Sequence, residues 1–392
     1  MKIAIFTDTF PPQTNGVAYA TLNTAKMLAN TGHKVTIFTP SKKANDYIDS
    51  SLKNLNVVNL YSLPAFVYPN ERMVIPFGKA FKLLKQMEPD IIHAHTPFGA
   101  GWLAVRGAKA LNVPLVGTHH TFFDHYLKYI KIDFNWMRNF SWKYTIGYYN
   151  KCDLIISPTN SLANVLKSAS LKKRVAVIPN FIDTNLFRPI STEQTKIEIK
   201  KMLGIPGDSI AYMGRLGYEK SIDKVVKAFA IMKKDIPDLK LMLIGDGPTK
   251  KELQKLAEEL GILKDVIFTG FLYDQDLVEA LWANDVFITA SKSENMPLSL
   301  LEAMATGLPV VSVREKGIAE IVKENENGFF AKTDDVEDIA KKVLEILNDK
   351  ATLKKFRNAS RKLALDYSPD KVIKSLENTY IELININKRK IK

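Results

Sequence analysis

The stretch from Val286 to Val313 constrains the fold of this chain more than any other part of the sequence. Its pattern predicts, in order, a buried strand, a polar loop, a helix and a second strand, at 286–289, 290–297, 298–306 and 309–313. The helix is apolar on nearly every side, so we expect it to be buried. Asn295 is expected to cap the helix, Pro297 to lie in its first turn and Gly307 to end it.

Two glutamates give this stretch a chemical character. Glu302 is the only charged side chain between Leu298 and Gly307, and an unpaired carboxylate on a buried helix is costly unless it accepts hydrogen bonds. Glu294 lies in the loop just before the same helix, whose N-terminus can bind an anion. The stretch therefore offers a phosphate site flanked by two carboxylates that can accept hydrogen bonds from sugar hydroxyls. The alternative is a solvated glutamate in the loop and a salt-bridged glutamate on the helix.

The composition is that of a globular protein, with 46% hydrophobic and 25% charged residues in a chain of 392. This length predicts two or three domains. Cys152 is the only cysteine, which excludes an intrachain disulfide and a cysteine metal cluster and fits a reducing cytosol. Residues 1–7 are too short and too strand-like for a signal peptide, and the sequence has no run of about 18 apolar residues that would predict a membrane span.

The net charge of +13 is concentrated in the first half of the chain. Residues 1–185 hold 21 Lys and Arg against 10 Asp and Glu, whereas residues 186–392 hold 34 against 32. A basic excess suits either nucleic acid or an anionic membrane surface. Because the sequence contains no zinc-finger spacing or other nucleic-acid motif, we do not expect a nucleic-acid partner.

The first half of the chain alternates predicted strands and helices, which is typical of a parallel sheet. Strands are expected at 2–6, 34–38, 56–60, 91–94, 114–118, 153–157 and 174–178. Ligands of such sheets sit beyond the carboxyl ends of the strands. Those ends carry Asp8, His93, His95, His120, Ser157 and Asn180. The loop after the first strand lacks a GxGxxG fingerprint, so an ordinary dinucleotide site is not expected, although Gly16 in this loop could let a backbone approach a phosphate.

His119 and His120 lie in a segment that holds three of the six histidines. Two adjacent imidazoles without a carboxylate-rich partner motif do not fit the fixed geometry of a metal site, so we expect no metal. A histidine that is hydrogen-bonded within its loop is the plain alternative to a functional one.

Aromatic and basic side chains are interleaved over residues 122–151. Trp and Tyr favour a membrane interface, while Lys and Arg attract anionic headgroups. We therefore predict that this segment docks on a membrane together with residues 63–85, which also mix apolar and basic side chains. The alternative is that the aromatic residues belong to the core and the lysines form a solvated face. The residues predicted to dock are Lys128, Lys131, Trp136, Arg138, Trp142 and Lys143.

The second half of the chain predicts another series of strands and helices, after a polar connection over 189–200. Arg215 and Lys220 lie between a strand expected at 210–213 and a helix expected at 221–233. Two cations near the start of a helix suit a diphosphate, and a solvated pair of charges is the alternative.

These segments resemble the retaining family 4 glycosyltransferases. The resemblance rests on Gly214-Arg215 with Lys220, and on Glu294-x7-Glu302 followed by Ala-Met-Ala-Thr-Gly-Leu-Pro-Val-Val, and it extends over essentially the whole chain. It implies the α/β fold called GT-B, with two Rossmann-like parallel-sheet domains that face a central cleft. The implied parts are an acceptor-binding, membrane-facing domain over 1–188, a nucleotide-sugar-binding domain over 189–367 and a C-terminal helix over 368–392 that crosses back to the first domain.

The resemblance also implies the reaction and the roles of individual residues. The reaction transfers a sugar from a nucleotide diphosphate sugar with retention of the anomeric configuration and without an obligatory metal or other cofactor. The implied catalytic residues are His120, Arg215, Lys220 and Glu294. The implied donor-binding residues are Gly16, Arg215, Lys220, Phe271, Glu294, Asn295, Met296, Pro297, Leu298 and Glu302. The implied acceptor-binding residues are Asp8, Asn15 and His120.

Residues 8–17 and 117–126 resemble the lipid-glycosylating branch of this family, which includes diacylglycerol glucosyltransferases and phosphatidylinositol mannosyltransferases. We therefore expect an enzyme of glycolipid biosynthesis that moves glucose from UDP-glucose to a lipid such as 1,2-diacylglycerol. We expect it at the cytoplasmic face of the cell membrane, bound to an anionic membrane surface. The alternatives are a GDP-mannose-dependent phosphatidylinositol-type mannosyltransferase, a transferase to a soluble acceptor and, in another class, a non-catalytic peripheral membrane-binding protein.

Overall fold

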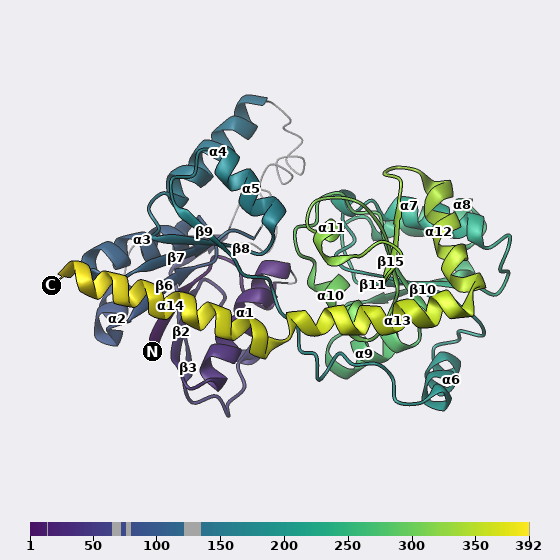
Figure 1. Ribbon diagram of the computed structural model, residues 1–392, viewed down its shortest axis with the longest axis horizontal. Coiled ribbons are helices and arrows are strands. Elements are labelled where there is room, and N and C mark those ends of the chain that lie inside the picture. Colours follow the sequence, from purple (N-terminus) through teal and green to yellow (C-terminus); the bar gives the residue numbers. More distant parts are fainter. Residues whose placement is uncertain (14, 65–71, 76–79, 121–134, 392) are drawn as a thin grey trace. The chain divides into compact units, whose positions relative to one another are not determined.

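The computed structural model describes residues 1–13, 15–64, 72–75, 80–120 and 135–391 (Figure 1). The chain divides into two compact units. The first unit contains Met1–Phe181 and Pro369–Lys392, and the second contains Ile182–Ser368. Backbone hydrogen bonding joins the start of the second unit to its end, because the N–H of Ile182 donates to the carbonyl of Tyr367 at 3.1 Å.

A parallel sheet with the strand order β3-β2-β1-β6-β7-β8-β9 forms the centre of the first unit. Its strands are β1 (Lys2–Phe6), β2 (Lys34–Thr39), β3 (Leu55–Asn59), β6 (Ile91–Ala94), β7 (Leu115–Thr118), β8 (Leu154–Ser157) and β9 (Arg174–Val177). The strand order reverses between β1 and β6, where Phe6 pairs with Ala94. Ligands of open α/β sheets bind beyond the carboxyl ends of the strands at such a reversal. The residues after β1 and β6 are therefore well placed to meet a ligand.

Alternate side chains of these strands point to opposite faces of the sheet, and helices cover both faces (Figure 1). One face packs against α1 (Gly16–Asn30) and α14 (Pro369–Ile391). The other face packs against α2 (Ala80–Met87), α3 (Gly99–Leu111), α4 (Asn135–Tyr149) and α5 (Asn160–Ser168). A short helix η1 (Ala44–Tyr47) and an antiparallel pair of strands, β4 (Ser62–Pro64) and β5 (Arg72–Val74), complete the described part of this unit. The C-terminal helix α14 is thus part of the core of the first unit.

The second unit repeats this architecture around a parallel sheet with the order β12-β11-β10-β13-β14-β15. Its strands are β10 (Ser209–Met213), β11 (Lys240–Ile244), β12 (Val266–Gly270), β13 (Val286–Thr289), β14 (Val310–Val313) and β15 (Gly328–Ala331). The order reverses between β10 and β13. The loops after these two strands, which carry Arg215 and Glu294, therefore lie at the reversal.

Helices also cover both faces of the second sheet. One face packs against α7 (Ile222–Met232), α8 (Lys250–Glu259) and α12 (Val336–Asn348). The other packs against α6 (Glu193–Met202), α9 (Asp274–Trp282), α10 (Leu298–Ala305) and α11 (Ile318–Ile321). The helix α13 (Lys350–Ala364) contributes side chains to both cores. Short helices η3 (Tyr218–Lys220), η4 (Leu263–Asp265) and η5 (Leu365–Tyr367) lie in the connections.

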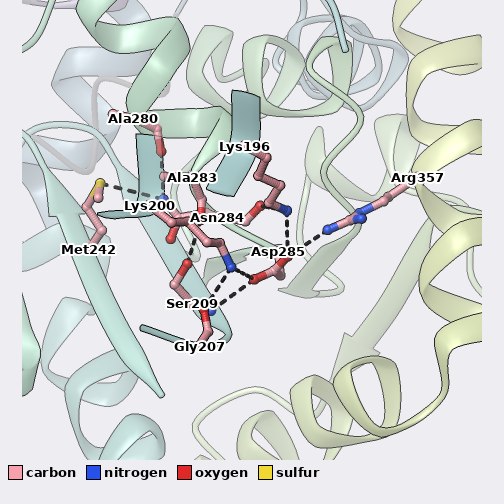
Figure 2. Close-up of polar contacts among 10 residues, drawn as sticks. All are labelled: Lys196, Lys200, Gly207, Ser209, Met242, Ala280, Ala283, Asn284, Asp285 and Arg357. Carbon is pink, nitrogen blue, oxygen red and sulfur yellow. Dashed lines mark hydrogen bonds and ion pairs between the residues drawn. The ribbon is translucent and has the colours of Figure 1, made fainter. Parts of the chain in front are cut away.

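A buried ion-pair network fastens α6 and α13 to the amino ends of β10 and β13 (Figure 2). The side chain of Asp285 is only 6% exposed, and it accepts hydrogen bonds from Lys196 at 2.6 Å, Lys200 at 2.7 Å and Arg357 at 2.7 Å. The backbone N–H of Ser209 is a further donor, at 3.1 Å. Burial alone would raise the pKa of Asp285, but the two lysines outweigh it, so the pKa lies below its ordinary value.

The helix α6 corrects the prediction of a polar connection over 189–200. Residues 193–202 are helical, with Thr192 as an N-cap that accepts a hydrogen bond from the backbone N–H of Thr195. The helix forms because Ile199 packs into the core and Lys196 is buried against Asp285, a partner that lies far away in the sequence.

Candidate functional site

The carboxyl ends of β10 and β13 bring together four charged residues of the second unit. Lys220 Nζ lies 2.5 Å from Glu294 Oε1, and Arg215 Nη2 lies 3.0 Å from Glu219 Oε1. The four side chains are partly buried, with exposed fractions between 16% and 31%. The two pairs are linked, because Ser293 Oγ donates to the backbone oxygen of Glu219 at 3.3 Å. We call Arg215, Glu219, Lys220 and Glu294 the charge cluster.

The ammonium group of Lys220 is held in its charged form within this cluster. Burial lowers the pKa of Lys220, but Glu294, Tyr212 and Glu219 together raise it by more, so the pKa lies above its ordinary value. The cluster contains two cations and two carboxylates. A nucleoside diphosphate that approaches this edge of the sheet would therefore meet two positively charged donors that are already in place.

Close backbone approach at this edge depends on glycine. Gly245 follows β11 with φ +139°, and a Cβ atom there would lie 2.0 Å from the carbonyl oxygen of Gly214. A Cβ atom at Gly247 would lie 2.4 Å from the carbonyl oxygen of Leu216. The loop after β11 therefore packs directly on the loop that carries Arg215, a contact that larger residues would prevent.

The helix α10 begins at Leu298, as predicted, but its cap differs from the prediction. Its N-cap is Pro297, in an extended conformation (φ −71°, ψ 119°), and no side chain caps the first turn. The prediction that Asn295 caps this helix is wrong, because Asn295 lies two residues before the N-cap and its side chain is buried in the loop. A proline N-cap has no side-chain acceptor to offer the first-turn N–H groups, and this geometry suits an anion.

The end of α10 confirms the predicted stop. Gly307 adopts φ +89°, which favours glycine, and its N–H donates to the carbonyl of Met304 at 2.9 Å. The N–H of Leu308 donates to Ala303 at 3.0 Å, so the last carbonyls of the helix have partners.

Glu302 lies on α10 and is partly buried. In the part of the chain that the structure describes, its carboxyl group forms no hydrogen bond or ion pair, and burial raises its pKa to about 7. An isolated carboxyl group of this kind gains free energy from any ligand hydroxyl that donates to it.

Three other residues predicted to bind the donor also belong to the second unit. Phe271 follows β12 and is exposed, whereas Met296 is buried in the core below α10. Leu298 is partly buried against that core.

Histidines occupy the carboxyl ends of β6 and β7 in the first unit. His95 Nδ1 lies 2.9 Å from His120 Nε2, and the side chain of His95 is buried. His93 contacts Thr118 Oγ1 and Tyr380 OH of α14, each at 2.6 Å. Burial lowers the pKa of His120 to about 4 and that of His93 to about 3, so these imidazoles are neutral near pH 7.

The histidines line a cavity of about 30 Å³. This volume is enough for one or two water molecules. Other walls of the cavity come from Thr24, Asn180, Val372 and Leu376. Within the described ranges, no group of three or more His, Cys, Asp or Glu side chains is arranged to hold a metal ion.

Asp8, a predicted acceptor-binding residue, is engaged in the fold. Asp8 Oδ1 accepts from the N–H of Ala100 at 2.9 Å, and Oδ2 accepts from Thr96 Oγ1 at 2.6 Å. The carboxyl group therefore caps the start of α3 from another segment of the chain. Burial raises its pKa to about 6 even though these donors lower it.

Asn15, also predicted to bind the acceptor, caps α1. Its Oδ1 accepts from the N–H of Ala18 at 2.9 Å, and its Nδ2 donates to Thr9 Oγ1 at 2.7 Å. A Cβ atom at Gly16 would meet no atom of the described residues within 4 Å, so these residues leave the space beside the start of α1 open. The acceptor-binding role of Asp8 and Asn15 stays a prediction.

The predicted docking residues are partly described. Trp136 and Phe140 of α4 are 66% and 65% exposed, and Lys143 on the same helix is also exposed. Trp142 is half-buried near His119, with ring centroids 6.2 Å apart. Lys128, Lys131 and the side chain of Arg138 lie outside the described residues.

Exposed apolar side chains continue beyond α4. Tyr144 donates its hydroxyl to the carbonyl of Pro97 at 2.7 Å, so α4 lies against the exposed Phe98 at the start of α3. Val74 of β5 packs against the same start of α3, and its neighbour Met73 is exposed. We call Met73, Phe98, Trp136, Phe140 and Tyr144 the aromatic face.

Two polar residues of these sites were not predicted from the sequence. Glu219 lies four residues after Arg215, a spacing that brings side chains together in a turn or helix and could have indicated the pair. Tyr380 lies on α14, and its buried hydroxyl needs a partner, which here is His93.

No helix in the described ranges is both long enough and apolar enough to span a membrane. Residues 14–186 match the family described as Glycosyltransferase Family 4, and residues 196–363 match Glycosyl transferases group 1.

The chain is 34% identical over 318 residues to an alpha-monoglucosyldiacylglycerol synthase of Streptococcus pneumoniae, which covers 80% of this chain and 71% of the relative. It is 26% identical over 404 residues to the protein of the same name from Acholeplasma laidlawii, which covers 100% and 99%. Among solved structures, Alr3699/HepE of Anabaena, in complex with UDP, matches with a TM-score of 0.78 at 18% identity, over 97% of this chain and 100% of the other.

The predicted fold class is confirmed, because the chain has two units built on parallel sheets and matches the solved structure of a glycosyltransferase from Rickettsia africae with a TM-score of 0.75 at 18% identity, over 98% of this chain and 99% of the other. The chain belongs to the family 4 glycosyltransferases of GT-B fold, in the branch that includes the two monoglucosyldiacylglycerol synthases.

Proposed function

We propose that the protein transfers glucose from UDP-glucose to a membrane lipid of the 1,2-diacylglycerol type, with retention of the anomeric configuration. The observation that carries the proposal is the charge cluster next to the uncapped start of α10 and the unpartnered carboxyl group of Glu302. The name of the Streptococcus pneumoniae relative, an alpha-monoglucosyldiacylglycerol synthase, supports the choice of sugar and lipid.

The second unit supplies the electrostatic part of the reaction. Cleavage of the anomeric bond places negative charge on the leaving diphosphate, which Arg215, Lys220 and the first N–H groups of α10 stabilise. Glu294 accepts hydrogen bonds from sugar hydroxyls, and Glu302 accepts them from the ribose. These interactions hold the donor while the positive charge on the sugar ring develops.

The first unit supplies His120, which we assign to the hydroxyls of the donor sugar. Its imidazole is neutral near pH 7, so it can donate through one nitrogen and accept through the other. The acceptor hydroxyl attacks the anomeric carbon from the face that the diphosphate leaves. The new bond joins the acceptor oxygen to the anomeric carbon, and the leaving phosphate oxygen takes the proton of the hydroxyl.

The aromatic face and the basic first half of the chain suit an enzyme that takes its acceptor from a bilayer. Exposed Trp and Phe side chains insert at the level of the headgroups, and lysines add attraction to anionic lipid. We assign the docking role to the aromatic face, together with the predicted basic residues of the segment around α4.

The donor and acceptor are tested together by assaying hydrolysis and transfer with UDP-glucose, UDP-galactose and GDP-mannose, with and without diacylglycerol vesicles. Consumption of UDP-glucose that depends on the lipid is the expected result. Lipid-dependent consumption of GDP-mannose would replace glucose by mannose, and consumption that ignores lipid would move the acceptor to a soluble molecule. No turnover of any donor in a lipid extract would favour a non-catalytic membrane-binding protein.

The docking role is tested by sedimentation with anionic vesicles. The double variant Trp136→Ala with Phe140→Ala should sediment less than the wild type, while activity on a detergent-solubilised acceptor is retained. Met202→Ala is the matched control, because Met202 is 80% exposed on α6 of the second unit. Equal sedimentation of the double variant and the wild type would contradict docking through α4.

A further inference from the structure

Arg215 is paired with a carboxylate of its own loop. Its guanidinium group lies 3.0 Å from Glu219 Oε1, and both side chains are partly buried. The position of Glu219 is fixed by the short helix η3 and by the hydrogen bond from Ser293 Oγ to its backbone oxygen. Glu219 therefore stands where the loop after β10 meets the loop after β13.

The charges of the cluster balance without a ligand. Arg215 and Lys220 carry two positive charges, and Glu219 and Glu294 carry two negative ones. The diphosphate of the proposed donor adds further negative charge, so binding with both ion pairs intact would leave the cluster negative in a partly buried site. Such an excess is unfavourable, and a carboxylate that leaves a cation relieves it.

The two carboxylates differ in what they can do once the donor arrives. Glu294 has sugar hydroxyls to accept from in the proposed complex. Glu219 is assigned no contact with the sugar, and its carboxylate lies 3.0 Å from the guanidinium group that the diphosphate would contact. Burial raises the pKa of Glu219 although Lys220 lowers it, so its charged form depends on the neighbouring cations.

We propose that Glu219 competes with the nucleoside diphosphate for Arg215, holding the guanidinium group when the site is empty and recovering it as the diphosphate product leaves. This inference rests on the proposed function, because it takes a diphosphate as the ligand of Arg215. The contact lowers product affinity and so favours release.

Two roles of Glu219, competition for Arg215 and orientation of Arg215, predict opposite effects on diphosphate affinity when its charge is removed. If Glu219 only oriented Arg215 toward the phosphates, removal of its charge would weaken diphosphate binding, because the guanidinium group would lose its support. If Glu219 competes, removal of the charge frees the guanidinium group and tightens binding.

The test is calorimetric titration of the full chain with UDP and with GDP. Glu219→Gln, which keeps the shape of the side chain and removes its charge, should lower the Kd of the preferred diphosphate by roughly three- to tenfold. Glu219→Asp keeps the charge but is one methylene shorter, and it should tighten binding by less. Thermal unfolding is measured for each variant to check that it is folded.

Glu252→Gln is the matched control. Glu252 accepts a hydrogen bond from Tyr218, the residue beside Glu219, at 2.6 Å, so its substitution removes the same charge nearby without a contact to Arg215. Its Kd should stay within about twofold of the wild type, as for an exposed charge.

The outcomes separate the competition from the proposed function. A Kd that is unchanged or raised in Glu219→Gln, or an equal decrease in Glu252→Gln, overturns the competition while the diphosphate site stands. Absence of UDP and GDP binding to the wild type and to all three variants overturns both.

Discussion

Glu302 should link nucleotide affinity to pH. Burial raises the pKa of its carboxyl group from 4.5 to about 7. Hydroxyls that donate to the carboxylate favour its charged form, so the proposed ribose contact lowers this pKa in the complex. Affinity is therefore highest above pH 7 and falls as the pH falls through 7, because binding must then remove a proton.

The size of the effect follows from the ionised fraction. With a pKa of about 7, the carboxyl group is about 90% ionised at pH 8 and about 10% ionised at pH 6. If the complex needs the charged form, the affinity for UDP falls roughly tenfold between these two pH values. The terminal phosphate of UDP also titrates near pH 6, but it affects the wild type and a Glu302 variant equally.

The assay compares calorimetric titrations with UDP at pH 8, 7 and 6 for the wild type and Glu302→Gln. At pH 8 the variant should bind more weakly, since a neutral amide oxygen is a weaker acceptor than a carboxylate. Between pH 8 and pH 6 the Kd of UDP should rise in the wild type by a factor roughly ten times larger than in the variant. Glu326→Gln, at an exposed site of the same unit, is the control that should follow the wild type. An identical pH dependence in the wild type and Glu302→Gln would refute the reasoning.

Three further substitutions probe the scaffold of the site. Asp285→Asn should lower the free energy of urea unfolding by about 3 kcal/mol or more, because it leaves buried cations without a partner, whereas Asp334→Asn at an exposed pair should cost less than about 1 kcal/mol. Similar losses in both would contradict the role of burial. Gly247→Ala should cost about 1–3 kcal/mol and weaken UDP binding, since its methyl group would meet the carbonyl oxygen of Leu216, and unchanged thermal unfolding would contradict this. Tyr380→Phe should lower the free energy of urea unfolding by about 1–3 kcal/mol, because it leaves the buried imidazole of His93 without its hydroxyl partner. An unchanged free energy of unfolding would show that His93 finds another hydrogen-bond partner.

The strands of both sheets were predictable because their signal is local. Three strands are short, mainly apolar runs bounded by polar or turn residues, namely Val286–Thr289, Ile91–Ala94 and Lys2–Phe6. The observed bounds of these strands, β13, β6 and β1, agree with the prediction. Strands buried on both faces need such apolar runs, so the sequence pattern is enough to predict where these strands lie.

Features that depend on distant partners were not predictable in this way. The helix α6 is mostly polar, and what holds it is the contact of Lys196 with Asp285, residues far apart in the sequence. The loop before α10 contains a good capping residue in Asn295, yet Pro297 takes the cap because the loop buries the asparagine side chain. The charge cluster shows the same limit. Arg215, Lys220 and Glu294 were predicted for the site, but the pairing of Arg215 with Glu219 required the turn of η3.

The two glutamates of the opening motif end in different environments, and this difference assigns their roles. Glu294, in the loop, accepts from Lys220 at 2.5 Å, so it is an acceptor whose charge is already compensated. Glu302, on the helix, has no such partner among the described residues. Its carboxylate is therefore stabilised most by the ligand hydroxyls that donate hydrogen bonds to it. If that part is the ribose, UDP and UDP-glucose should lose affinity by the same factor between pH 8 and pH 6, because both carry the same ribose. A larger loss for UDP-glucose would place Glu302 at the sugar and exchange the roles proposed for the two carboxylates.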